Sequence, residues 1–369
     1  MKYLKLIEVC DIVPGYAFKS SDFCSSGANV VKITDINPPN VDTINCSKIN
    51  VKKYDLNKLS KFEVHRGDFV IAMTGATVGK LGMVRNGSAY LNQRTAKFCA
   101  KNVNQNYLYY LLSSNKFYQF IINNIDSNSA QPNISANSIG RYQFKCHELA
   151  EQQHTVNILG SIDDKIENNK KKILNIKKLI MNLYEKISLN KPYVKIGNFT
   201  TEIKERLNSR TSKAYSVINS GELVEQDSYF VRQIHSNDMY KYKVIRKYDF
   251  AYNPSRINIG SIAMFQHEFG AVSPIYIAFT CDKKYSYYIN EFTKTSQFNK
   301  EICLRANGSV RQTVNYDSFI EIQIPLPDEN DLIKYNNVYF KLQEIVVVLK
   351  SENIKLNKLK KLYLKKFFS

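Results

Sequence analysis

The longest regular pattern in the chain runs through residues 149–187, where apolar residues recur in steps of three and four. An average step of 3.5 residues returns side chains to one face of a helix and is typical of a coiled-coil seam. Lysines dominate the positions between them, and a lone buried Asn, here Asn169, is expected to fix the register of such a seam. The predicted seam comprises Leu159, Ile162, Ile166, Asn169, Ile173, Ile176, Ile180, Leu183 and Ile187.

The same spacing returns near the end of the chain, at residues 338–363, again among many lysines. A single amphipathic helix is most simply explained by packing on a local core. Two long ones, each following a globular segment, favour a pair of helices that bury their stripes against each other. The predicted second seam comprises Val338, Leu342, Ile345, Leu349, Leu356, Leu359 and Tyr363, with Glu352 at the remaining position.

The chain also repeats itself. Residues 67–72 (GDFVIA) are echoed by 248–252 (YDFAY), and 79–84 (GKLGMV) by 260–265 (GSIAMF), each 181 positions later. Gln131 and Gln312 are separated by the same interval, and Lys186 and Lys366 lie 180 positions apart near the ends of the two predicted helices. Several anchors in one order at nearly one interval indicate a duplication of a globule followed by a long helix.

Inside each globule, short β-branched and aromatic runs between glycine turns are typical of strands. Strands are predicted at 68–73, 80–84, 95–100, 141–144, 215–218, 247–252, 261–265, 275–281 and 319–324, and helices at 106–122 and 285–303. The absence of a βαβ rhythm favours an α+β class. The predicted organisation is a first domain at 1–148, a helix at 149–190, a second domain at 191–327 and a second helix at 328–369.

The charge balance points to a polyanionic partner. Lys and Arg number 52 against 33 Asp and Glu, which gives a formal net charge of +19. Nucleic acid is the first candidate, because no lipidation motif, basic amphipathic terminus or span-length apolar run favours a membrane. Seven scattered cysteines form no C-x-x-C pair, and with no signal peptide evident they favour a reducing cytoplasm and no zinc site.

No motif supports catalysis. Residues 74–81 (TGATVGKL) resemble a phosphate loop but lack its first glycine and its Mg²⁺-binding hydroxyl, so a turn between strands is the better interpretation. The segment 37–40 (NPPN) lacks the aromatic residue that closes the motif of amino-methyltransferases, and 201–204 (TEIK) lacks the Pro-Asp of a nuclease site. We therefore expect no catalytic, cofactor-binding or metal-binding residues.

Nucleic-acid contacts are expected instead from basic and amide side chains in predicted turns, because Arg and Gln can reach base edges and Lys can neutralise phosphates. For each residue alone, a solvated surface position is the simpler interpretation. The candidates are Lys80, Arg85, Gln93, Arg94 and Gln131 in the first domain and Arg256, Arg311 and Gln312 in the second.

The chain resembles the specificity (S) subunits of type I restriction-modification systems. The resemblance rests on 67–80 (GDFVIAMTGATVGK), 91–94 (LNQR), 131–135 (QPNIS), the helix opening 149–153 (LAEQQ), 158–167 (ILGSIDDKIE), and 324–327 (IPLP) before the second helix. It covers nearly the whole chain, although the second copy lacks the Thr-Gly turn and has 328–330 (DEN) where the first has EQQ.

The resemblance implies two target recognition domains, each reading half of a split, asymmetric site in double-stranded DNA, and an antiparallel coiled coil that holds them apart. It also implies a prokaryotic cytoplasmic complex with two methyltransferase (M) subunits and restriction (R) subunits. Those partners would use S-adenosylmethionine, ATP and Mg²⁺, while this chain would be non-catalytic. The alternatives are a coiled-coil scaffold whose charge is incidental, and a DNA-modifying enzyme in its own right.

Overall fold

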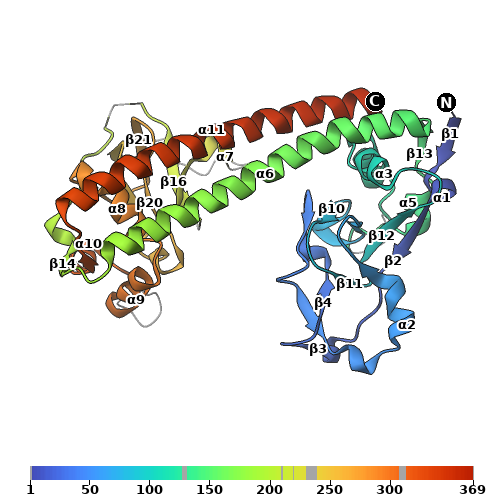
Figure 1. Cartoon of the computed structure of the whole chain (residues 1–369), viewed down its shortest axis with the longest axis horizontal. Helices are drawn as coiled ribbons and strands as arrows, with labels where there is room; N and C mark the ends of the chain where they lie inside the picture. The colour runs from blue at the N-terminus through green and yellow to red at the C-terminus, as the bar shows by residue number, and fades with distance from the viewer. Residues whose placement is uncertain are drawn as a thin grey trace. The chain divides into compact units, whose positions relative to one another are not determined.

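The computed structural model describes residues 2–126, 131–208, 211–218, 220–229, 239–306 and 313–368. They form two compact units (Figure 1). Unit 1 comprises residues 1–168 with 352–369, and unit 2 comprises residues 169–351. Each unit therefore contains a globular α+β domain and portions of two long helices.

In unit 1, an antiparallel pair, β1–β13, joins the two ends of the domain, and two larger sheets have the orders β2-β12-β9-β10-β6-β5 and β3-β7-β4-β11-β8. The strands are β1 (Lys2–Lys5), β2 (Cys10–Pro14), β3 (Phe23–Cys24), β4 (Ala28–Val31), β5 (Ile36–Asn37), β6 (Asn40–Val41), β7 (Ser47–Ile49), β8 (Glu63–Val64), β9 (Phe69–Ala72), β10 (Leu81–Val84), β11 (Ala89–Leu91), β12 (Thr95–Ala100) and β13 (Gln143–Cys146). The helices of the domain are α1 (Leu6–Val9), α2 (Leu56–Leu59), α3 (Gln105–Leu112), α4 (Asn115–Asn123) and α5 (Ala136–Gly140).

The central strand β9 is buried along its whole length and supplies two cores. Because side chains alternate across a strand, Phe69 and Ile71 face the core under α3 and α4, whereas Val70 and Ala72 pack in a second cluster with valines of the smaller sheet. The first core continues into the long helices through Leu159 and Phe368. The domain of unit 1 thus packs on its own helix ends through continuous apolar contact.

Unit 2 repeats this plan with smaller sheets: β14–β23, β15-β22-β19-β20 and β17-β16-β21-β18. Its strands are β14 (Tyr193–Lys195), β15 (Thr200–Glu202), β16 (Ala214–Ile218), β17 (Glu222–Glu225), β18 (Lys243–Arg246), β19 (Phe250–Tyr252), β20 (Ile262–Met264), β21 (Phe269–Val272), β22 (Ile277–Cys281) and β23 (Gln323–Pro325). Its domain helices are α7 (Gln226–Tyr229), α8 (Lys283–Phe292), α9 (Ser296–Arg305) and α10 (Tyr316–Phe319).

Equivalent contacts confirm the duplication. In unit 1 the rings of Phe69 and Phe98 stack with centroids 5.2 Å apart, and in unit 2 Phe250 and Phe279 do the same at 5.0 Å. Each pair joins the central strand to its neighbour, and both members are shifted by 181 positions between the copies. The repeat seen in the sequence therefore describes three-dimensional equivalence.

One difference between the copies explains a residue exchange. In unit 1, β6 pairs with β10 so closely that a Cβ on Gly82 would lie 2.6 Å from the carbonyl oxygen of Asn40. In unit 2 the sheet ends at β20, among the described residues, and the equivalent position is Ala263. The added strand therefore requires glycine in the first copy, whereas no strand among the described residues of the second copy pairs at this place, and a side chain fits there.

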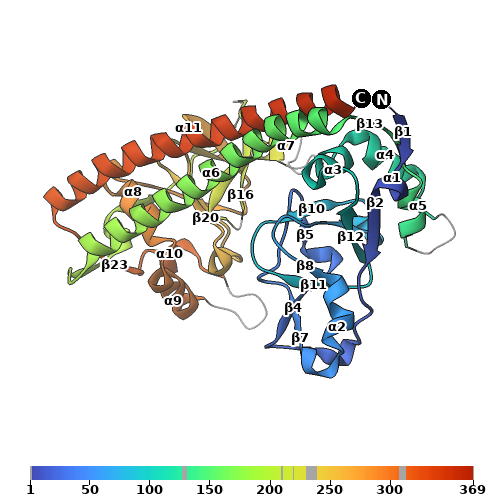
Figure 2. The same ribbon diagram turned by 45° about the vertical axis from the view of Figure 1, so that its right-hand side comes forward.

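The long helices are α6 (Leu149–Ser188) and α11 (Glu329–Phe368). In each unit their portions run side by side in opposite directions (Figures 1 and 2). The start of α6 meets the end of α11 in the core of unit 1, and the end of α6 meets the start of α11 in that of unit 2. The antiparallel packing implied by the resemblance is therefore present in each unit.

The structure revises the register of the second seam. All nine predicted positions of α6 are buried or half-buried, but in α11 Val338 is 42%, Ile345 48% and Leu359 41% exposed. Their neighbours Tyr339, Val346 and Lys360 occupy the seam instead. The prediction was wrong there because apolar residues also fill a flanking row of α11, which offers a second three–four pattern through Leu342, Leu349 and Leu356. The observed seam of α11 is Leu332, Tyr335, Tyr339, Leu342, Val346, Leu349, Asn353, Leu356, Lys360, Tyr363 and Phe367.

Both long helices predicted inside the domains are divided in two. The predicted helix 106–122 is α3 and α4, since Ser114 caps α4 by accepting from the amide of Phe117. The predicted helix 285–303 is α8 and α9, and Thr295 caps α9 through the amide of Phe298. A hydroxyl that caps a new helix competes with continuation of the old one.

Three predicted strands also need correction. The predicted strand 247–252 comprises only β19, because Tyr248 takes a left-handed turn (φ 78°) after β18 ends. The predicted strand 319–324 begins in α10, whose Asn315 cap accepts from the amide of Ser318, and the strand itself is β23. The strand predicted at 141–144 is β13, displaced toward the C-terminus by α5.

Candidate DNA-recognition surface

Three segments from different parts of unit 1 meet at one end of its larger sheet. The amide of Met73, just after β9, donates to the carbonyl of Arg94 (2.9 Å), just before β12. The amide of Gly75 donates to the carbonyl of Pro132 (2.8 Å), and the amide of Ile134 donates back to the carbonyl of Met73 (3.0 Å). We call this junction of residues 73–80, 92–94 and 131–134 the loop end.

The loop end brings together four of the predicted contact residues. Lys80, Gln93, Arg94 and Gln131 are all exposed, and a guanidinium nitrogen of Arg94 donates to the side-chain carbonyl of Gln131 at 3.5 Å. The amide groups of Gln93 and Gln131 can contact base edges, and the cations Lys80 and Arg94 can contact base edges or phosphates. Residues up to 51 positions apart in the sequence thus form one surface.

Arg85 lies elsewhere. It follows β10, whereas Lys80 precedes that strand, so the two side chains leave opposite ends of it. The guanidinium of Arg85 lies 3.9 Å from the carboxylate of Asp163 in α6, and its side chain is only 32% exposed. The structure therefore assigns Arg85 to the junction with the long helices and not to the loop end.

The turn at 74–81 is not a phosphate loop. It carries the short 3₁₀ turn Gly75–Thr77 and connects β9 directly to the antiparallel strand β10. A phosphate loop must lead from a strand into a helix, whose N-terminus binds the anion. Left-handed Gly75 (φ 72°) and Gly79 (φ 82°) shape the turn instead.

Sequence reasoning missed Tyr118, which is 45% exposed on α4. A Cβ built on Gly79 would lie 3.5 Å from the Tyr118 ring, so this aromatic side chain stands directly beside the loop end. Exposed aromatic rings can stack on bases or pack on sugars. Tyr118 could have been noticed in the sequence as a Tyr on the polar side of a predicted helix. It was missed because the helix was predicted to be continuous from 106 to 122, which gives Tyr118 a different position relative to the turn at 74–81.

Unit 2 has an equivalent loop end of different composition. The amide of Asn253 donates to the carbonyl of Ser261 (3.0 Å), and the amide of Val314 donates to the carbonyl of Pro254 (3.2 Å). Arg256 is exposed in this turn, as predicted for a contact residue. Ile275, the equivalent of Arg94, is 64% exposed and apolar. Arg311 and Gln312 lie outside the described residues.

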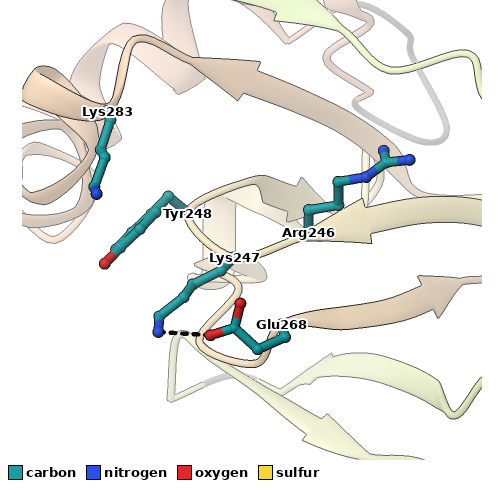
Figure 3. Close-up of a pocket in the computed structure, with 5 residues that line it drawn as sticks. All are labelled: Arg246, Lys247, Tyr248, Glu268 and Lys283. Atoms are coloured by element: carbon teal, nitrogen blue, oxygen red, sulfur yellow. Dashed lines mark hydrogen bonds and ion pairs between the residues drawn. The ribbon is translucent and has the colours of Figure 1, made fainter.

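An open pocket of about 490 Å³ in unit 2 is lined by Arg246, Lys247, Tyr248, Glu268 and Lys283 (Figure 3). Two of its cations are already paired, since Arg246 makes two bonds to Glu205 (2.7 and 3.1 Å) and Lys247 lies 2.7 Å from Glu268. The pocket follows β18, at the other end of β19 from the loop end. It is therefore an open groove in which two of the three cations are already paired with carboxylates.

The described residues contain no cluster of three or more His, Cys, Asp or Glu side chains that could hold a metal ion. Burial raises the pKa of the Cys10 thiol to about 12, and that of Cys281 likewise to about 12, so neither is an activated nucleophile. Within the same described part of the chain, no helix combines the length and apolarity needed to cross a membrane.

Comparison with known proteins identifies the first part of the chain. Residues 1–178 match the model of the type I restriction modification DNA specificity domain. Just under half of the chain is therefore similar to that DNA specificity domain. The resemblance inferred from the sequence is thereby confirmed for the segment that holds the loop end of unit 1 and most of α6.

Two relatives extend the identification. The specificity subunit of the type I restriction enzyme MjaVIII from Methanocaldococcus jannaschii is 30% identical over 191 residues, which cover 49% of this chain and 44% of that protein. The chain thus spans less than half the length of that curated relative in the alignment. The crystal structure of a type I restriction-modification S subunit from M. genitalium has a TM-score of 0.61, covering 100% of this chain and 96% of that one at 15% identity. At this identity the likeness shows the fold, which is therefore that of an S subunit.

The family match covers most of unit 1, and the internal repeat extends the same fold to unit 2. The family match ends at residue 178, before the second domain begins. Unit 2 nevertheless shares the strand pairings, the stacked Phe pair and the loop end of the specificity domain. The structure therefore shows a second copy of the fold in a part of the chain that the family match does not reach.

Proposed function

We propose that this chain is the DNA-recognition subunit of a type I restriction-modification enzyme and that each unit reads one half of a bipartite, asymmetric site. The duplicated loop end is the observation that carries this proposal. Both copies expose side chains on the same end of the same sheet, but the exposed residues differ, as with Arg94 and Ile275. Two similar domains with different contact residues suit a site whose halves differ in sequence.

The excess of cations supplies the affinity for DNA. A net charge of +19 favours phosphate contacts, which release counterions and make binding salt-dependent. Lys80 and Arg94 at the loop end provide such contacts beside the amide groups of Gln93 and Gln131. The same charge without the duplicated loop end would suit a scaffold equally well, so sequence-specific binding distinguishes the two.

Partner subunits complete the enzyme in this proposal. Two methyltransferase subunits would use S-adenosylmethionine, and restriction subunits would use ATP and Mg²⁺, while this chain performs no catalysis and works in a prokaryotic cytoplasm. The long helices offer a surface for such partners. In unit 2, α11 exposes Phe340 (47%), Val347 (62%) and Val348 (64%). Exposed apolar side chains at this density are typical of protein-binding surfaces.

Methylation mapping tests the proposal. The chain is expressed with a cognate methyltransferase subunit in a host without other modification systems, and modified positions are mapped across the genome. We expect one split motif, and no modification when either chain is expressed alone. Methylation by this chain without a partner would contradict the proposal, as would partner-dependent methylation without sequence preference.

A matched variant tests the loop end. Replacing Gln93, Arg94 and Gln131 by Ala should abolish or relax one half of the motif and leave the other half unchanged. Replacing the exposed lysines Lys52 and Lys61, which lie outside the loop end, serves as the charge control and should leave both halves intact. Each base-reading contact is expected to contribute about 1–3 kcal/mol of discrimination.

A further inference from the structure

One carboxylate in unit 1 collects polar groups from three other elements. Asp163 of α6 accepts a hydrogen bond from the hydroxyl of Tyr110 on α3 (3.0 Å) and one from the ammonium of Lys360 on α11 (2.6 Å). The guanidinium of Arg85, which follows β10, lies 3.9 Å from the same carboxylate. The recognition domain and both long helices therefore meet at Asp163.

The junction is largely withdrawn from water. The side chains of Asp163 and Lys360 are 10% and 12% exposed, and Tyr110 is buried. The ammonium of Lys360 also lies over the rings of Tyr109 and Tyr110, at 6.0 and 5.4 Å. Burial, together with the negative charge of Asp163, raises the pKa of Tyr109 to about 12 and also raises that of Tyr110, so both remain neutral.

The charges occupy a position that hydrophobic packing usually fills. Lys360 is a seam residue of α11, and its equivalent in α6, 180 positions earlier, is Ile180, which is 1% exposed. A buried ion pair contributes little net stability compared with apolar side chains of similar size, but it prefers one geometry. The network is therefore better explained by orientation than by stability.

The hydrogen bond between domain and long helix uses different residues in the two units. Tyr110 is replaced in the second copy by Glu291, which is 3% exposed and accepts from the hydroxyl of Tyr339 on α11 at 3.3 Å. In unit 1 the domain supplies the tyrosine and a long helix the carboxylate, and in unit 2 the roles are exchanged. The directional bond recurs although its residues do not, which indicates that a directional link is needed at this joint.

We propose that Asp163 is a positioning residue that fixes the orientation of the first recognition domain on its helix ends and thereby restricts the spacing of the DNA half-sites that the subunit accepts. The proposal rests on the function proposed above. Apolar packing tolerates small rotations because it is non-directional, whereas two hydrogen-bond donors and a nearby guanidinium that converge on one carboxylate favour a single arrangement. Asp163 acts through the domain and touches no base.

The main test replaces the network by apolar groups in the full chain. The variant Tyr110→Phe, Asp163→Leu, Lys360→Leu leaves no buried charge from the Asp163–Lys360 pair. The control Lys165→Gln, Glu352→Gln removes an ion pair between the same two helices (3.5 Å) that is half exposed and involves no side chain of the domain. Each variant is assembled with the methyltransferase subunit and given DNA with the native spacer or one base pair more or less.

We expect the triple variant to methylate the same bases and to lose about tenfold of its preference for the native spacer, the change corresponding to one lost charged hydrogen bond. The control should keep the full preference. A folded triple variant with an unchanged spacer preference would overturn the proposal. The single variant Tyr110→Phe, which keeps the ion pair, should show a smaller loss in the same direction and decides the matter if the triple variant does not fold.

A measurement without DNA separates this proposal from the proposed function. Spin labels on exposed Cys24 and on a cysteine introduced by Lys365→Cys, in a chain carrying Cys303→Ser, report the distance between the domain and α11 within unit 1. We expect a narrow distance distribution in the parent and control chains and a broad one in the triple variant. A narrow distribution in all three would refute the positioning role even if methylation proceeds. An inactive complex with the expected broadening would count against the proposed function alone.

Discussion

The revised seam of α11 makes a prediction about two adjacent residues of unit 2. Val346 is 3% exposed and Ile345 is 48% exposed. Val346→Ala removes two buried carbon atoms, which costs about 1.6 kcal/mol in transfer and about 2–3 kcal/mol with the cavity included. Ile345→Ala removes three carbons from a half-wet position and gains helix propensity, so its effect should stay within about 0.5 kcal/mol.

Urea unfolding of the full chain, followed by far-UV circular dichroism, separates the two outcomes. With a slope of about 2 kcal/mol per molar urea, Val346→Ala should lower the midpoint of the transition that includes α11 by about 1 M. Ile345→Ala should leave it within about 0.3 M by the same slope. The smaller substitution is thus predicted to have the larger effect. A midpoint lowered more by Ile345→Ala would restore the register predicted from the sequence and refute the reasoning from burial.

Three further predictions concern single side chains. Gly82→Ala should destabilise the folded chain by about 1–3 kcal/mol, because the added Cβ would meet the Asn40 carbonyl. Gly160→Ala should stabilise it by up to about 1 kcal/mol, because the added Cβ would meet only the Tyr110 hydroxyl at 3.8 Å. Thermal unfolding of each variant measures both effects. Mass spectrometry after brief maleimide labelling should find exposed Cys24 modified and Cys10, a buried thiol of raised pKa, unmodified. Burial raises the pKa of Asp249, so the folded state binds a proton at this carboxyl more readily than the unfolded state does. As pH falls from 7 toward 4, the free energy of unfolding of the parent should therefore rise relative to that of Asp249→Asn. A difference in unfolding free energy that does not change with pH would exclude the shift.

The sequence contained more information about the helices than the heptad pattern alone provided. The seam of α6 includes Ile166, Ile173 and Ile180, and adding 180 to these positions gives Val346, Asn353 and Lys360, all members of the observed seam of α11. The repeat thus predicts polar seam positions that a search for apolar residues rejects. The apolar periodicity did not predict Lys360 as a seam residue, because a lysine can be buried there only through its bond to Asp163. That contact joins residues far apart in the chain and is not visible in the local pattern.

The candidate surface was predictable in part. Turn chemistry identified Lys80, Gln93, Arg94 and Gln131, because glycines and polar clusters between strands mark loops. It could not show that these loops meet, since that depends on backbone bonds such as Met73 to Arg94. It also could not separate Arg85, whose carboxylate partner lies in α6.

The glycine at position 82 has a consequence for the history of the two copies. Strand β6 approaches β10 so closely at this position that it can be accommodated only where the partner residue lacks a Cβ, whereas its loss would require no change in β10. The second copy, with Ala263 at this place, could acquire an equivalent of β6 only after a substitution that by itself weakens β20. An ancestor that had the added strand could have given rise to both copies by loss of the strand in one of them. An ancestor without the strand would first have needed the substitution to glycine. Exchange of whole domains between the two positions avoids this constraint, because each glycine or alanine travels with the sheet that needs it.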